Sequence, residues 1–269
     1  MVRKNVWDLL ASKKLDCYEE ANSLYFLVNK KNTFDYGNSL ADELDYNFLY
    51  LEHRQSFVTL NAMLHYLGLD TTIYDSDLDK LDLLMETLLL LTEDLYNFII
   101  KPNTSQINNA LTISREIRDN INNILSLSNQ MLLNTSKDKK LNKNIIVPKD
   151  ELATTAAEIS LPDDANIALS ILGYSHYSNK NDLINKRLIL NQLANYIEPK
   201  LNKHDPSDSN IGFALNNLQI RHNNDNQLNI NDKVLNNIYD LLYREILRFI
   251  TNDSHSTFTK TIKDLRQKN

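Results

Sequence analysis

The sequence has 269 residues, of which 42% are hydrophobic and 24% charged, and its formal net charge is −6. These values are typical of a folded chain, and the acidic balance argues against a constitutive, high-affinity polyanion binder. With 4 Gly and 5 Pro, the chain has few of the breakers that a sheet-rich protein needs, which favours long helices. The single Cys17 cannot form an internal disulfide and the N-terminus lacks a secretory pattern, so we expect a soluble, cytoplasmic protein.

The first half of the chain predicts an antiparallel bundle of about four helices. A weak helical pattern covers residues 7–28, and a long helix is expected from Leu40 to Leu67, with Ser39 as N-cap and Gly68 as its stop. The next helix begins at residue 75 or 76 and ends at Ile100 before the Lys-Pro pair, and the third begins near residue 105. The apolar run from residue 83 to 100 contains three acidic residues, so it predicts a buried helix and no membrane partner.

Residues 135–150, TSKDKKLNKNIIVPKD, have no helical period and are rich in lysine and asparagine. Such a composition is expected of an exposed connector. We therefore predict a helical bundle over residues 1–134, a linker over 135–160 and a second helical domain over 161–269. The expected fold class is all-α.

The second domain has four predicted helices, over residues 164–174, 182–197, 209–221 and 232–250, and a short tail helix after Ser256. Asn231 is a suitable N-cap for the fourth helix. A broad apolar stripe predicts that this helix is well buried. Its members are Val234, Leu235, Ile238, Leu241, Leu242, Ile246, Phe249 and Ile250.

Most motifs that carry chemistry are missing from the sequence. The acidic run from Tyr74 to Asp79 lacks the glycine and the glutamate of a calcium loop, and neither His53 nor His65 has a metal-binding partner four residues away. There is also no phosphate loop, dinucleotide fingerprint, serine nucleophile elbow or paired-cysteine motif. We therefore expect neither a metal nor a cofactor.

The remaining candidate is the segment NIGFALNNLQIRHNN, residues 210–224. Its polar group, Asn216, Asn217, Arg221 and His222, gathers toward the expected end of the third helix. Histidine moves protons near neutral pH, and arginine holds phosphate by two hydrogen bonds, so the pair suits phosphodiester cleavage without a metal. Alternatively, Arg221 and His222 only satisfy the last carbonyl groups of their helix.

The layout of residues 164–250 resembles that of HEPN domains, particularly those of bacterial abortive-infection and toxin proteins. The resemblance rests on NIALSIL, NKRLILNQLANYIEPKL, ALNNLQIRHNN and the closing amphipathic helix. In that family the third helix ends in an arginine, often followed by asparagine and then by a histidine. His222 matches the histidine and Asn217 the polar residue, whereas Asn216 stands where the arginine is expected and Arg221 precedes the histidine.

The resemblance implies an up-and-down helical bundle that cleaves RNA without metal, with two motifs meeting across a homodimer of the second domain. His222 would move the proton, Arg221 would stabilise the phosphate, and Asn216 and Asn217 would orient the substrate. Phage defence or growth arrest would be the outcome, with the N-terminal bundle binding a protein partner or sensing a trigger. The departure at Asn216 keeps a second hypothesis open, a non-enzymatic helical adaptor or dimerisation protein.

Overall fold

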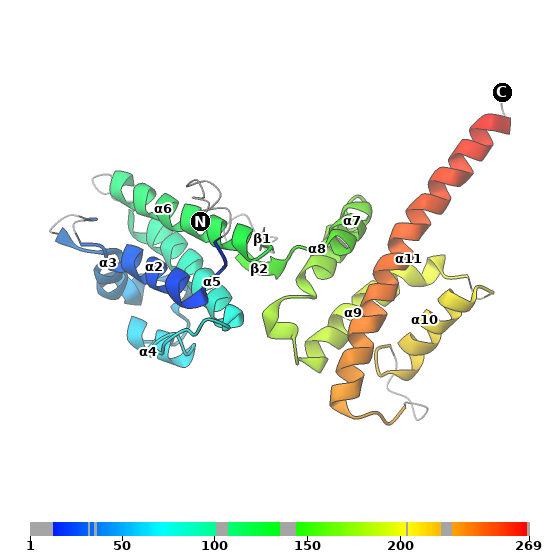
Figure 1. The fold of residues 1–269 in the computed structure, drawn as a ribbon, viewed down its shortest axis with the longest axis horizontal. Helices are drawn as coiled ribbons and strands as arrows, with labels where there is room; N and C mark the ends of the chain where they lie inside the picture. Colours follow the sequence, from blue (N-terminus) through cyan, green and yellow to red (C-terminus); the bar gives the residue numbers. More distant parts are fainter. Residues whose placement is uncertain are drawn as a thin grey trace, which may run out of the picture. The chain divides into compact units, whose positions relative to one another are not determined.

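The computed structural model describes residues 13–31, 33–34, 37–100, 107–134, 144–202, 204–221 and 228–267. Side chains are described throughout these ranges except at 98–100, 107–111 and 253–267. The chain divides into two compact units, Met1–Ile146 and Val147–Asn269, here called unit 1 and unit 2. The structure is mostly helical, as predicted, and Figure 1 shows its elements.

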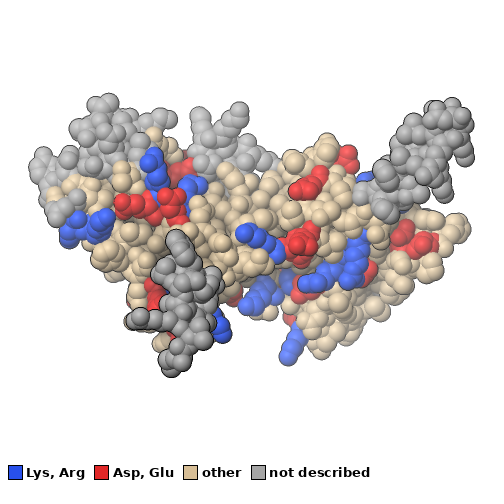
Figure 2. All heavy atoms as spheres, turned by 45° about the horizontal axis from the view of Figure 1, so that its top comes forward, with Lys and Arg blue, Asp and Glu red and all other residues tan. Residues whose placement is uncertain are grey.

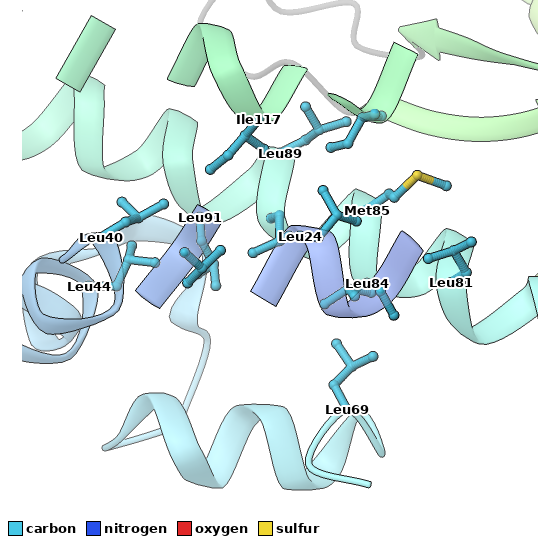
Figure 3. Close-up of a cluster of buried hydrophobic side chains, with 14 of the residues drawn as sticks. Leu24, Leu40, Leu44, Leu69, Leu81, Leu84, Met85, Leu89, Leu91 and Ile117 are labelled. Atoms are coloured by element: carbon cyan, nitrogen blue, oxygen red, sulfur yellow. The ribbon is translucent and has the colours of Figure 1, made fainter. Parts of the chain in front are cut away.

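Unit 1 consists of helices that bury a leucine- and isoleucine-rich core. In chain order, its elements are α2 (Cys17–Asn29), α3 (Leu40–Asn47), η2 (Phe48–Tyr50), η3 (Glu52–Arg54), α4 (Leu60–Tyr66), α5 (Leu78–Asp94), the π-helical η4 (Leu95–Ile100) and α6 (Ile107–Leu127). Helix α2 packs against α3, α5 and α6. Figure 3 shows Leu24 of α2, Leu84 of α5 and Ile117 of α6 within one cluster of buried side chains.

The predicted long helix from Leu40 to Leu67 is wrong. Its N-cap is confirmed, because Ser39 and Asp42 form a reciprocal capping box. The helix nevertheless ends at Asn47, and the chain passes through two short 3-10 turns and Gln55, whose φ is 55°, before α4 begins. Gly68 ends α4 as predicted, with a φ of 68° and the amide of Leu69 bonded back to Leu64 O at 2.8 Å.

Two short strands, β1 (Gln130–Asn134) and β2 (Asn144–Pro148), form a two-stranded sheet, so the fold is not purely α-helical. The strand β2 and helix α7 (Glu151–Ser160) lie within residues 135–160, which the sequence analysis assigns to a linker. The β-branched run Ile145, Ile146 and Val147 suits a strand, and Ile146 and Val147 are buried. The boundary between the units falls inside this run.

Unit 2 contains α7, α8 (Ala165–Gly173), η5 (Tyr177–Asn179), α9 (Leu183–Ile197), η6 (Glu198–Lys200), α10 (Pro206–Asn217) and α11 (Asp232–Gln267). Helix α11 packs against α7, α9 and α10. The side chains of Asp164, Asp182 and Asn231 cap α8, α9 and α11, and the cap at Asn231 confirms the prediction for that residue.

Helix α11 differs from its prediction in two ways. It continues to Gln267 without a separate tail helix, since no glycine or proline interrupts residues 232–267. In addition, Val234 and Leu241 are 45% and 64% exposed, so they do not belong to the buried face. The tyrosines Tyr239 and Tyr243 take part in the core instead, because their hydroxyl groups donate to the buried carbonyls of Leu218 and Ile171.

Candidate functional site

The candidate segment, residues 210–224, begins within α10, which ends at Asn217 and not at Arg221 as predicted. The chain leaves the helix through Gln219, whose φ is 60°. The hydroxyl of the buried Tyr239 donates to Leu218 O at 2.8 Å, which satisfies one of the terminal carbonyl groups. Arg221 therefore lies beyond the helix.

Both flanks of residues 222–227 are hydrogen-bonded to the last turns of α10. The amide of Arg221 donates to Leu215 O at 3.2 Å, and the amide of Leu228 donates to Asn217 O at 3.1 Å. The side chain of Asn191 on α9 donates to Ile220 O at 3.1 Å. These bonds hold Ile220, Arg221 and Leu228 against α9 and the end of α10.

The guanidinium of Arg221 forms an ion pair with Glu198, with 2.6 Å between Nη2 and Oε2. The side chains of Arg221 and Glu198 are 21% and 45% exposed, so the pair is accessible to solvent. Glu198 directly follows α9 in η6, and it holds the guanidinium toward the end of that helix. A guanidinium has five N–H donors, and a single carboxylate cannot accept hydrogen bonds from all of them. The remaining donors can therefore bind a further acceptor such as phosphate.

The two candidate asparagines occupy the last turn of α10. The amide of Asn217 donates to Phe213 O at 2.8 Å, a bond within the helix, whereas the exposed Asn216 has other interactions. His222 lies outside the described residues. The structure thus positions Arg221 and both asparagines at one end of α10 and leaves the role of His222 a prediction.

Acidic and basic side chains are interspersed on the face of the protein shown in Figure 2. In unit 2, Lys200 lies 3.8 Å from Asp163, and Arg248 pairs with Glu245. Because basic side chains are paired with acidic ones in this way, this surface is better suited to binding a nucleic acid through a few local phosphate contacts than along a continuous basic groove. Within the described ranges, no group of three or more potential metal-ligating side chains occurs, and no helix is long and apolar enough to span a membrane.

Sequence analysis missed a histidine–carboxylate pair in unit 1. The His53 ring lies 2.5 Å from Asp94, measured between Nδ1 and Oδ1, and the His53 amide donates to the other carboxylate oxygen at 2.8 Å. A separation of 41 residues hides this pair from any motif search. The carboxylate of Asp94 is almost completely buried, at 2% exposure, and the bonds tie η3 to the end of α5.

No protein-family model, curated protein or solved structure matches this chain.

Proposed function

We propose that unit 2 is an RNA-cleaving effector domain of the HEPN type that acts without a metal ion. The observation that carries the proposal is the Arg221 guanidinium, which is solvent-accessible, held by Glu198 and directly followed by His222. In this proposal Arg221 binds the scissile phosphate, and His222 takes the proton of the neighbouring 2′-hydroxyl. The 2′-oxygen attacks phosphorus and the bond to the 5′-oxygen breaks. The leaving 5′-oxygen takes a proton from the protonated His222 of a second copy, so a cyclic phosphate and a 5′-hydroxyl result.

Homodimerisation through unit 2 is part of the same proposal. A second copy would bring another Arg221 and His222 to the cleft and so supply the cation that Asn216 does not provide. Asn216 and Asn217 would orient the substrate by hydrogen bonding. Growth arrest or phage defence would follow from cleavage of host or phage RNA.

The experiment compares the purified full chain with its His222→Ala and Arg221→Ala variants on labelled single-stranded RNA in the presence of EDTA. Loss of a general acid or base lowers the rate by about 10²- to 10⁴-fold, so we expect cleavage by the wild type and almost none by His222→Ala. The matched control is His204→Ala, which removes an exposed histidine elsewhere in unit 2. Equal cleavage by the wild type and His222→Ala rules out the assigned role.

A second function, that of a non-enzymatic adaptor, draws support from the surface of unit 1. Five of its aromatic side chains are at least 69% exposed, and aromatic residues are enriched in protein interfaces. They are Phe26, Tyr46, Tyr50, Tyr66 and Tyr74. If the protein is an adaptor, we expect it to degrade no RNA at any protein concentration. We also expect it to form a stable complex with a protein partner, and Tyr46→Ala or Tyr50→Ala should weaken that complex.

A further inference from the structure

Unit 1 contains a pocket of about 340 Å³ between helix α2 and the loop that follows α4. One wall is a face of α2, and the other is a five-residue stretch of backbone and side chains. The lining residues are Tyr18, Ala21, Asn22, Tyr25, Leu69, Asp70, Thr71, Thr72 and Ile73. The volume lies at the lower end of the range for small-molecule sites, roughly 300–1,000 Å³, which suits a single small ligand.

Hydrogen bonds hold the two walls of the pocket in place. The hydroxyl of Tyr25 donates across the pocket's edge to Leu69 O at 2.8 Å. The ammonium of Lys80 donates to the carbonyls of Thr71 and Thr72 at 3.3 and 3.2 Å, and Figure 3 shows Leu69 pointing from the loop toward the core. A site that is already ordered loses little conformational entropy when a ligand binds.

The charges around the pocket favour a neutral ligand. Among the described residues, Asp70 is the only charged one in the lining, and its carboxylate lies 2.6 Å from the Nδ1 atom of His65. Lys80, which binds the loop, also acts on Asp70 electrostatically. A ligand cation therefore meets a carboxylate that is already paired, and a phosphate meets no lysine or arginine in the lining.

The groups that face the pocket suit a flat, polar ring. Tyr18 is 47% exposed and offers a phenol ring for stacking, and the exposed Asn22 lies between Tyr18 and Tyr25 on the same face of α2. An asparagine amide pairs with adenine by donating to N7 and accepting from the 6-amino group. A tyrosine ring beside such an amide is a common arrangement for holding an unstacked base.

We propose that this pocket binds an adenine base, which stacks on Tyr18 and forms hydrogen bonds with Asn22. The base comes either from a free nucleoside or nucleotide or from single-stranded RNA. RNA as its source rests on the proposed function of unit 2, whereas the recognition of the base does not. In the RNA case, unit 1 contributes base preference to a chain whose unit 2 acts on the phosphodiester backbone.

The experiment is calorimetric titration of the full chain with adenosine, inosine and adenosine monophosphate. We expect adenosine to bind and inosine, which lacks the 6-amino group, to bind at least fivefold more weakly. The monophosphate should bind within about twofold of adenosine, because no lysine or arginine is among the described residues that line the pocket. Binding of inosine as tight as that of adenosine, a monophosphate that binds tenfold tighter, or no adenosine binding at millimolar concentration overturns the proposal.

Variants of Tyr18 and Asn22 test the two contacts separately. Tyr18→Ala should weaken adenosine binding about tenfold, the size of a lost base–aromatic stack, whereas Tyr18→Phe keeps the ring and should bind within about twofold of the wild type. Asn22→Ala should make adenosine bind as weakly as inosine. The control is Tyr46→Ala, which removes an exposed tyrosine outside the pocket, and unchanged thermal melting shows that each variant is folded. Wild-type affinity in Tyr18→Ala refutes the stacking role.

A short oligoadenylate distinguishes the two sources of the base. Tighter binding of the oligomer than of adenosine, with the gain lost in Tyr18→Ala, identifies RNA as the source, and equal affinity identifies the free nucleoside. Adenosine has no phosphodiester bond, so its titration does not depend on cleavage, and the oligoadenylate is titrated in the His222→Ala background to prevent cleavage. A His222→Ala variant that binds adenosine normally but leaves RNA intact supports both proposals. If the wild-type chain shows only one of the two activities, the missing activity identifies the proposal that failed.

Discussion

The Asp94 carboxylate accepts two hydrogen bonds from a single residue, the ring and the backbone amide of His53, which lie at 2.5 and 2.8 Å from its two oxygens. Both groups of His53 come from the 3-10 turn η3, and Asp94 is the last residue of α5. The carboxylate is 2% exposed, so it depends on these donors in place of water. This pair connects the irregular segment between α3 and α4 to the C-terminal end of helix α5.

Replacing His53 with alanine should destabilise unit 1 by about 1.5–3 kcal/mol, because a buried carboxylate loses a charge-assisted hydrogen bond. The hydrogen-exchange rates of the α5 backbone amides measure this change in the stability of unit 1. Glu52→Ala, which alters an exposed side chain in the same turn, is the control and should shift stability by no more than about 0.5 kcal/mol. Identical exchange in His53→Ala and the wild type shows that the pair contributes nothing.

Gln55 has a φ of 55° and an exposed side chain, so its backbone is in a conformation that favours glycine. We expect Gln55→Gly to stabilise unit 1 by about 0.5–1 kcal/mol, since relief of backbone strain exceeds the added entropy of the unfolded chain. The matched control is Ser56→Gly at the next exposed position, where φ is not positive and glycine should destabilise. Urea denaturation of the two variants gives opposite signs if the strain is real.

His65 and Asp70 predict a measurable pH dependence. The hydrogen bond from His65 lowers the pKa of Asp70, and the same bond raises the pKa of His65 above its usual 6.5. The interaction is therefore fully present below the pKa of an unfolded histidine and is lost as pH rises through the folded value. At the acid end, it is lost as pH falls through the lowered pKa of Asp70.

An NMR titration of the histidine ring signals tests this pH dependence. We expect the midpoint of His65 to lie above 6.5 and to return toward 6.5 in Asp70→Asn, which removes the charge and keeps the size of the side chain. Asp70→Asn does not alter the hydrogen-bond partners of the other histidines, so the midpoints of those histidines serve as internal controls. A His65 midpoint that does not move in Asp70→Asn would contradict the assignment.

In unit 2, the ammonium of Lys186 is 4% exposed and lies 2.6 Å from Asp240 Oδ1, which also accepts from the Tyr174 hydroxyl at 3.0 Å. Asp240→Asn should destabilise the protein by about 1–3 kcal/mol, because it leaves the buried ammonium of Lys186 without its counter-charge. The Asp240 side chain is 47% exposed, so water screens the ion pair and keeps the loss below that of a fully buried pair. Adding Lys186→Met should restore most of the loss, since the methionine fills similar volume without a charge. Thermal melting of the single and double variants measures both changes in stability. If the double variant is no more stable than Asp240→Asn, the loss of the counter-charge does not explain the destabilisation.

Local signals in the sequence predicted much of unit 2 and less of unit 1. Asp164, Asp182 and Asn231 cap their helices through bonds two or three residues away, so they are visible in the sequence. In unit 1, the turn η3 after α3 is bonded through His53 to Asp94, which is 41 residues away, and no local pattern reports this contact. The buried face of α7 consists of small side chains, including Ala153, Ala156 and Ala157, which give a weak apolar period.

For the candidate segment, the sequence pattern did not predict the course of the backbone after Asn217. The periodic pattern extended the helix to Arg221, whereas the hydroxyl of Tyr239 and the amide of Asn191 draw residues 218–220 away from the helix axis. Both partners come from other helices, so the turn is a tertiary effect. The ion pair of Arg221 with Glu198 has the same origin, and a single sequence offers no signal that joins positions 23 residues apart.

The amides of Arg221 and Leu228 both donate to carbonyl groups near the end of α10, those of Leu215 and Asn217. Because one helix end holds both residues, a substitution that unwinds or lengthens the last turn of α10 would displace the two together. Redesign of this domain should therefore keep that turn unchanged as the common reference for both positions.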